Sequence, residues 1–222
     1  MATVALPLLE GPRLQEQRIA MTFEEFLALP ENLHAEWVDG EAIIFKSTTA
    51  LHARVITFLV RLVGGFAEEL GLGEVLTAPY GMRVRSGRPF REPDVMFVSA
   101  VHRDRVVGIA VEVPADLVIE VVSDDSVTRD RTEKFEEYQE TGVSEYWIYD
   151  PRPGQERVDA YHLGDAGRFE PIAPDAEGRL RSVVLPGFWL RLDWLQADPL
   201  PSVRAVLAEI LAELPRTGSA TD

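Results

Sequence analysis

The pattern of apolar and polar positions is most informative over residues 116–150, where it predicts a strand, a loop, a helix and a second strand. Residues 117–122 are aliphatic at nearly every position, which is typical of a central strand covered on both faces of a sheet. Glu120 is the one charged residue in this run. A carboxylate buried there must be neutralised, paired with a cation or bound to a metal. We therefore expect Glu120 to have such a partner.

The helix after this strand is predicted over residues 128–140, between the turn residues SDDS and Gly142. Asp130, Lys134 and Tyr138 are spaced four residues apart, so they share one ridge at the flank of the core-facing side. From that ridge Lys134 can reach the end of the strand, or it can form a surface ion pair with Asp130. As a flank residue it is expected to contribute little to stability. The chain has two lysines among its 22 basic residues, and a compact ammonium beside a reacting water would account for a lysine here.

The remaining periodicity predicts one α/β (α+β) domain, a mixed β-sheet core flanked by helices. The longest helix is expected to carry one apolar stripe, formed by Leu51, Val55, Phe58, Leu59, Leu62 and Phe66. Residues 100–113 are expected to form a loop. The other expected elements are a short helix opened by the capping box Thr22–Glu25, a hairpin over 35–45 around Asp39-Gly40, the long helix over 47–70, strands at 74–79, 82–85 and 94–98, an antiparallel edge hairpin from 158–163 and 168–172, and a packing segment over 185–194.

Both ends of the chain differ from this central part. Residues 1–20 have no clear period and are expected to form an N-terminal arm, residues 21–198 the domain, and residues 199–222 a C-terminal amphipathic helix and tail. The apolar face of that helix could cover the domain or pair with a second copy, and the second interpretation, a homodimer, is slightly favoured. The face consists of Val203, Val206, Leu207, Ile210, Leu211 and Leu214.

Composition limits the classes of function. The chain of 222 residues contains no Cys, which excludes disulfides, thiolate metal sites and cysteine nucleophiles. It has no run of about 18 apolar residues and no secretion signal, so a soluble, cytoplasmic protein is expected. A net charge of -15 argues against a general binder of polyanions. The single basic stretch, 83–105, has six Arg against three acidic residues, so any nucleic-acid contact must be local.

Two further positions carry candidate chemistry. Pro93 suits the first position of a strand, so Asp94 is expected at the mouth of a core strand that precedes the strand of Glu120. Two such carboxylates suit Mg²⁺, which proteins hold through one or two carboxylates together with waters and phosphate oxygens. Glu36 and His52 are secondary candidates, because an exposed strand carboxylate and a surface or capping histidine explain them as well.

This order of residues resembles the PD-(D/E)XK nuclease superfamily, which has the restriction-endonuclease-like fold. The closer resemblance, over about residues 21–195, is to the Uma-two family of putative restriction endonucleases. It rests on His52 and on the ordered segments MTFEEFLALP, AEWVDGE, REPDVMFVS, DLVIEVVS, RDRTEKFEEYQETGVSEYWIYDP and LPGFWLRLDWL.

The resemblance implies a metal-dependent endonuclease acting on nucleic acid, expected to be DNA, with Mg²⁺ or alternatively Mn²⁺ as cofactor. It implies that Asp94, Glu120 and Lys134 are catalytic and that the metal is held by Asp94, Glu120 and the carbonyl of Val121. The superfamily's strand lysine would stand at Val122, so the resemblance assigns its role to Lys134 on the helix. The alternative is a catalytically silent dimer that keeps the nuclease fold as a scaffold for nucleic acid or protein.

These assignments predict a geometry and a titration. The side chains of Asp94 and Glu120 should converge within reach of one cation. Without metal their repulsion should raise at least one pKa above the ordinary value of about 4, with Lys134 moderating the effect.

Overall fold

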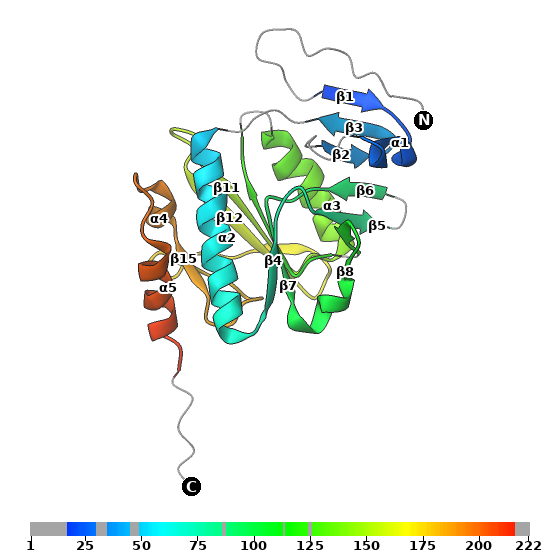
Figure 1. The fold of residues 1–222 in the computed structure, drawn as a ribbon. Helices are drawn as coiled ribbons and strands as arrows, with labels where there is room; N and C mark the ends of the chain where they lie inside the picture. Colours follow the sequence, from blue (N-terminus) through cyan, green and yellow to red (C-terminus); the bar gives the residue numbers. More distant parts are fainter. Residues whose placement is uncertain are drawn as a thin grey trace.

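The structure, a computed structural model, describes residues 17–29, 35–44, 49–85, 88–112, 114–123 and 126–215. Within these ranges the strands form two large sheets and one small one (Figure 1). The six-stranded sheet has the order β13 (Phe169–Pro171), β12 (Arg157–Leu163), β11 (Glu145–Asp150), β10 (Leu117–Val121), β7 (Val95–Ser99) and β4 (Gly73–Leu76). The seven-stranded sheet has the order β1 (Gln17–Ala20), β3 (Glu41–Ile44), β2 (Ala35–Val38), β6 (Arg88–Arg91), β5 (Gly81–Arg85), β9 (Ala110–Val111) and β8 (Val106–Val107). The small sheet pairs β14 (Arg179–Arg181) with β15 (Trp189–Arg191).

Strand β10 lies inside the six-stranded sheet, as its aliphatic run predicts. It pairs in parallel with β11 and antiparallel with β7. All five of its residues are buried, including Glu120. The predicted edge hairpin is also confirmed, because β12 pairs antiparallel with β13 at the margin of the sheet.

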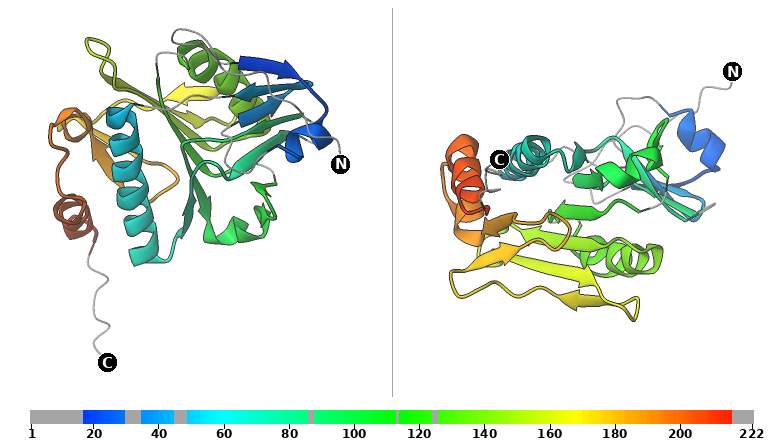
Figure 2. Two further views of the ribbon diagram at one scale, coloured as in Figure 1. Left: turned by 45° about the horizontal axis from the view of Figure 1, so that its top comes forward. Right: turned by 90° about the horizontal axis from the view of Figure 1, so that it is seen from below.

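Helices cover both faces of this sheet. Leu117, Ile119 and Val121 face α2 (Ala50–Leu70) and pack into the same apolar cluster as its buried side chains. Val118 and Val122 point the other way and pack with Tyr138 of α3 (Lys134–Thr141). The alternation of strand side chains therefore places α2 and α3 on opposite faces (Figures 1 and 2).

Helix α3 also contacts the seven-stranded sheet, so it lies between the two large sheets. Met82 and Val84 of β5 belong to the same cluster as Tyr138, and the hydroxyl of Thr141 donates to the carbonyl oxygen of Val84. A π-helical turn, η2 (Arg129–Glu133), comes directly before α3, and Gly142 ends the helix in the left-handed conformation with a φ of 93°. The predicted helix is thus present, with a widened first turn.

Helix α2 is the longest helix in the described part of the chain. By length and composition it alone, within those residues, could cross a membrane. Here its apolar side packs against the six-stranded sheet on one flank and α5 (Val203–Ala212) on another. The predicted stripe is buried except at Leu51, which is 42% exposed because it lies in the first turn of the helix.

The predicted C-terminal helix is present as α5, whereas part of the predicted N-terminal arm forms a strand. Val203, Val206 and Ile210 of α5 are buried in the cluster that contains α2, so the C-terminal apolar face covers the domain itself. α5 follows the short helix α4 (Leu192–Gln196). At the other end, residues 17–20 of the predicted arm form β1, which pairs with β3, and residues 1–16 lie outside the described residues.

The predicted loop over 100–113 contains local structure: the 3₁₀ helix η1 (Ala100–Arg105) and the short strands β8 and β9. The Asp116 carboxylate explains part of this order. It accepts hydrogen bonds from the Ser99 backbone amide at 2.7 Å and from His102 Nδ1 at 2.7 Å. The remaining helix, α1 (Phe23–Leu27), begins at the predicted capping box.

Candidate active site

The structure brings Asp94 and Glu120 to the same point of the six-stranded sheet. The β7–β10 register ends at Val95 opposite Ile119, so the next step places Asp94 opposite Glu120. The backbone amide of Val121 donates to Asp94 Oδ2 at 2.7 Å. Two carboxylates therefore lie beside each other where β7 begins and β10 ends.

Lys134 reaches Glu120 from α3. Its Nζ atom lies 2.9 Å from Glu120 Oε1, 3.2 Å from Glu36 Oε1 and 3.5 Å from Asp130 Oδ1. Tyr138, one turn further along the helix, also donates to Glu120 Oε1, at 2.9 Å. The ridge of Asp130, Lys134 and Tyr138 thus faces the strand, as its spacing allowed.

One alternative and one expectation for Lys134 assumed an exposed position, which the structure contradicts. Lys134 does form an ion pair with Asp130, but the lysine is only 3% exposed and Asp130 is buried, so this is not a surface pair. The expectation of a minor contribution to stability fails for the same reason. Removing a buried cation leaves the surrounding carboxylates without compensation, which is strongly destabilising.

Glu36 is central to the site, and its interpretation as an exposed strand carboxylate is wrong. It is 1% exposed, and its Oε2 atom accepts from Arg91 Nη1 at 2.9 Å. Its Oε1 atom accepts from the backbone amide of Glu92 at 3.1 Å and contacts Lys134. Glu36 therefore connects β2 with the helix lysine.

Arg91 is the residue that sequence reasoning missed. It is fully buried, and its Nε and Nη2 atoms donate to the two carboxylate oxygens of Glu137, each at 2.8 Å. This bidentate pair of hydrogen bonds fixes the orientation of the guanidinium, whose Nη1 atom then donates to Glu36. In the sequence Arg91 was counted only as part of the basic stretch, although its place three residues before Asp94 was a signal that it belongs to the site.

His52 approaches Asp94 from the first turn of α2. Its Nε2 atom is 3.6 Å from Asp94 Oδ2, and its side chain is mostly buried. The Thr49 hydroxyl accepts from the His52 backbone amide, so the residue also takes part in the helix cap. Its Nδ1 atom is buried and makes no hydrogen bond to any described residue.

Comparison with known proteins places the chain in a family. The model of the Uma2 family, described as "Putative restriction endonuclease", matches residues 23–193. The chain belongs to the Uma2 family. The matched region agrees with the resemblance seen over residues 21–195 and stops before α5.

A solved structure supports the fold of this Uma2 chain. A crystal structure from Anabaena variabilis, described as a putative nuclease belonging to DUF820, matches with a TM-score of 0.65 and 18% sequence identity. The match covers 79% of this chain and 97% of that chain. The comparison with curated proteins finds no match. At this identity the likeness establishes the nuclease fold alone.

The site of this Uma2 protein combines carboxylates with very different proton affinities. Burial raises the pKa of Glu36, but the nearby Lys134 and Arg91 charges outweigh it and lower the value to about 2. Burial is also the largest influence on Glu120, where Lys134 opposes it only in part, and the pKa rises to about 8. Burial raises the pKa of Asp94 as well. A raised carboxyl pKa was predicted, but desolvation contributes more to it than repulsion does.

The donor set suits a hard cation. Among the described residues there is no group of three or more His, Cys, Asp or Glu side chains placed to hold a metal. The two carboxylates and the Val121 carbonyl are nevertheless the kind of oxygen donors that Mg²⁺ takes together with waters and phosphate oxygens. Asp130 Oδ1 is buried beside Lys134 and makes no hydrogen bond to a described residue. The residues therefore fit a magnesium site that is completed by water or substrate.

The four arginines of the basic stretch whose side chains the structure describes do not form a common surface. Arg83 pairs with Glu112, Arg103 pairs with Glu74, and Arg91 is buried in the candidate site. The guanidinium of Arg105 donates to the carbonyl oxygen of Pro114. These four arginines are therefore distributed over different contacts.

Proposed function

We propose that this Uma2 protein is a metal-dependent endonuclease that hydrolyses phosphodiester bonds in DNA. Mg²⁺, with Mn²⁺ as the alternative, would be held by Asp94, Glu120 and the Val121 carbonyl. The observation that carries the proposal is the buried ammonium of Lys134, 2.9 Å from a carboxylate that lies beside Asp94 at the ends of two core strands. Membership of the family and the nuclease fold support the same chemistry.

Each side chain of the site would have a separate role in this reaction. A bound cation would lower the pKa of its water and offset the charge that develops on the phosphate. The ammonium of Lys134 would orient the attacking water and stabilise the phosphate oxygens. Glu36, itself held by Arg91, keeps that ammonium at the strand end. Tyr138 orients Glu120 through its hydrogen bond.

The arrangement also explains how catalysis is possible although a valine, Val122, stands where the superfamily has its strand lysine. Val122 lies on the same face as Glu120, but its side chain is buried in the apolar cluster that includes Tyr138. Lys134 reaches Glu120 from the helix that covers this face. A lysine from α3 can therefore supply the positive charge that a strand lysine would otherwise provide.

A cleavage assay tests the proposal. Duplex, single-stranded and branched DNA would be incubated with Mg²⁺, with Mn²⁺ or with a chelator. We expect metal-dependent cleavage by the wild type and a loss on the order of 100-fold or more in Asp94→Asn and Glu120→Gln, which remove charge from the metal ligands. Lys134→Arg should also lose cleavage, because a planar guanidinium cannot replace a compact ammonium at the water.

Glu69→Gln is the matched control, because Glu69 is an exposed carboxylate near the far end of α2. It should cleave like the wild type. Full activity in Glu120→Gln, or a folded wild type that binds DNA without cleaving any substrate, would reject the proposal. The second result would favour the scaffold function.

A further inference from the structure

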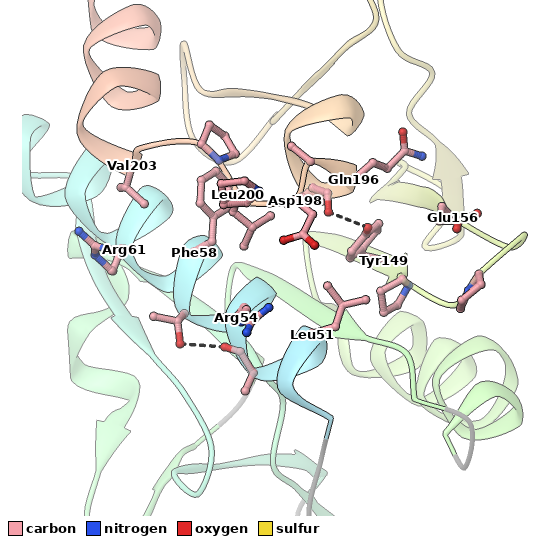
Figure 3. A pocket seen from close by; sticks show the side chains of 18 residues that line it. Leu51, Arg54, Phe58, Arg61, Tyr149, Glu156, Gln196, Asp198, Leu200 and Val203 are labelled. Carbon is pink, nitrogen blue, oxygen red and sulfur yellow. Dashed lines mark hydrogen bonds between the residues drawn. The ribbon is translucent and has the colours of Figure 1, made fainter.

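A groove of about 1160 Å³ opens on the α2 side of the six-stranded sheet (Figure 3). One wall is the exposed side of α2, where Arg54 and Arg61 lie. The floor includes Tyr149 at the end of β11. The opposite wall is the segment that joins α4 to α5, with Gln196 and Asp198.

The groove lies at the same ends of β10 and β11 as the candidate active site, but it opens on the α2 face, whereas Glu120 and Lys134 lie on the α3 face. Leu51, at its margin, directly precedes His52, whose Nε2 atom is 3.6 Å from Asp94. Tyr149 pairs in register with Val121, whose amide donates to Asp94. From this end the groove follows α2 past Arg54 toward Arg61 (Figure 3). A ligand in the groove would therefore lead toward the strand ends that carry the two carboxylates.

The α2 wall is cationic in a strongly acidic protein. Arg54 and Arg61 are seven residues apart, which separates them by about 10 Å along the helix on the same side. Both are exposed, and neither forms an ion pair with a described residue, in contrast to Arg83, Arg91 and Arg103. Such cations are available to the phosphates of a ligand.

The opposite wall offers hydrogen-bond acceptors. Asp198 and Gln196 lie across the groove from the arginines, and Glu156 lies near its mouth (Figure 3). Carboxylate and amide oxygens can accept from the amino groups of bases. The groove thus matches a strand of nucleic acid that presents phosphates to α2 and base edges to the other wall.

The dimensions favour one strand over a duplex. The volume of about 1160 Å³ is slightly above the range of small-ligand pockets, about 300–1000 Å³, so the groove can hold a few nucleotides. A peptide fits less well, because β11 is paired on both sides with β10 and β12 and offers no free strand edge. The Tyr149 hydroxyl is also already engaged, donating to the Leu195 carbonyl oxygen at 3.1 Å.

We propose that this groove binds a single-stranded segment of nucleic acid adjoining the bond to be cleaved. The substrate class would be DNA with a single-stranded end or flap. The cleavage part of this inference rests on the proposed function, whereas the binding part does not.

Binding is therefore measured without metal. Fluorescence anisotropy in a chelator would compare a labelled single strand of about 12 nucleotides with a blunt duplex of the same sequence. We expect the single strand to bind more tightly. In Arg54→Ala/Arg61→Ala, affinity should fall about tenfold or more, and the dependence of log K on log salt should weaken by about 0.7 for each lost phosphate contact.

Arg168→Ala is the matched control. Arg168 is an exposed arginine beside β13, in the hairpin at the opposite end of β11, and it too forms no ion pair within the described residues. Its affinity and salt dependence should equal those of the wild type. Equal effects in both variants, tighter duplex binding, or binding of an extended peptide in place of the oligonucleotide would overturn the inference.

The two proposals fail in different ways. Cleavage that depends on Asp94 but is unchanged in Arg54→Ala/Arg61→Ala would reject the groove and keep the endonuclease. Single-strand binding that depends on both arginines, in a protein that cleaves no substrate, would keep the groove and reject the endonuclease.

Discussion

At the scale of single residues, the candidate site holds more carboxylates than cations. Four carboxylates, those of Glu36, Glu120, Asp130 and Glu137, contact the buried cations Arg91 and Lys134. A third buried cation, Arg129, also lowers the pKa of Glu36. These cations together keep Glu36 ionised, but Lys134 does not offset the burial of Glu120, whose pKa rises to about 8. Asp94 adds a further buried carboxyl group beside it. This local excess of acid is the physical reason that a divalent cation suits the site.

The raised pKa of Glu120 predicts how stability depends on pH. In the unfolded chain a glutamate loses its proton near pH 4.5, whereas in the folded protein Glu120 keeps it until about pH 8. Between these values the folded state binds more protons than the unfolded state, so the free energy of unfolding should fall as pH rises. Glu36 does not contribute to this window, because its pKa is lowered to about 2.

Urea unfolding in a chelator at several values between pH 5 and pH 8 measures this slope. We expect it to flatten in Glu120→Gln, which cannot titrate, and on addition of Mg²⁺ to the wild type. An identical slope in the wild type and in Glu120→Gln would show that other groups produce it.

At the scale of elements, the sequence predicted those features that depend on neighbouring residues. The capping box at Thr22 and the Asp39-Gly40 turn form as expected, with φ values of 47° and 95° at the two turn residues. The long helix ends at Gly71 in the left-handed conformation. Each of these depends on contacts within a few residues, which a local pattern records.

Features set by distant residues could not be predicted in the same way. Glu36 is buried because Arg91, 55 residues later, and Lys134 compensate its charge. Leu51 has the spacing of a core residue but lies at the margin of the groove. Likewise, the apparent loop before β10 is ordered by Asp116. A single sequence does not show which charges meet across the fold.

Glu145 gives a prediction at this scale, because it joins two elements. This buried first residue of β11 accepts hydrogen bonds from the Ser182 hydroxyl at 2.8 Å and from the Val183 and Val184 amides at 3.0 and 2.9 Å. The Trp147 indole nitrogen also donates to Glu145, whereas the Val184 amide has a second acceptor in the Ser182 hydroxyl. Glu145→Ala removes the acceptor of the Trp147, Ser182 and Val183 donors and should lower the free energy of unfolding by about 3 kcal/mol or more.

Glu145→Gln retains an accepting oxygen and should lose less. Both effects are measured by urea unfolding. Because Glu145 lies at the end of β11 away from the candidate site, the specific activity of either folded variant should stay that of the wild type. Equal losses of stability in the two variants would contradict the assignment of these hydrogen bonds.

At the scale of the whole molecule, the core is built around α2, with the six-stranded sheet on one flank and α5 on another. The family match ends at residue 193, so α5 lies beyond it. Its packing is nonetheless close: a Cβ atom added at Gly65 of α2 would lie 3.1 Å from a methyl carbon of Leu207. The C-terminal helix therefore packs on the domain through Val203, Val206 and Ile210, while the other apolar residues of its face are partly buried.

This role of α5 predicts the effect of truncating Ile210, which is fully buried against the α2 cluster. Ile210→Ala should lower the free energy of unfolding by about 2–5 kcal/mol, because the lost methyl groups leave a cavity. Since the contact is within one chain, the loss should not depend on protein concentration.

The exposed neighbour Glu209 provides the control, and Glu209→Ala should change stability by no more than about 0.5 kcal/mol. Urea unfolding at several protein concentrations, together with light scattering to measure the molecular mass, distinguishes packing within one chain from a contact between two copies. A transition midpoint that rises with concentration, together with a dimer that dissociates in Ile210→Ala, would show that this face joins two copies.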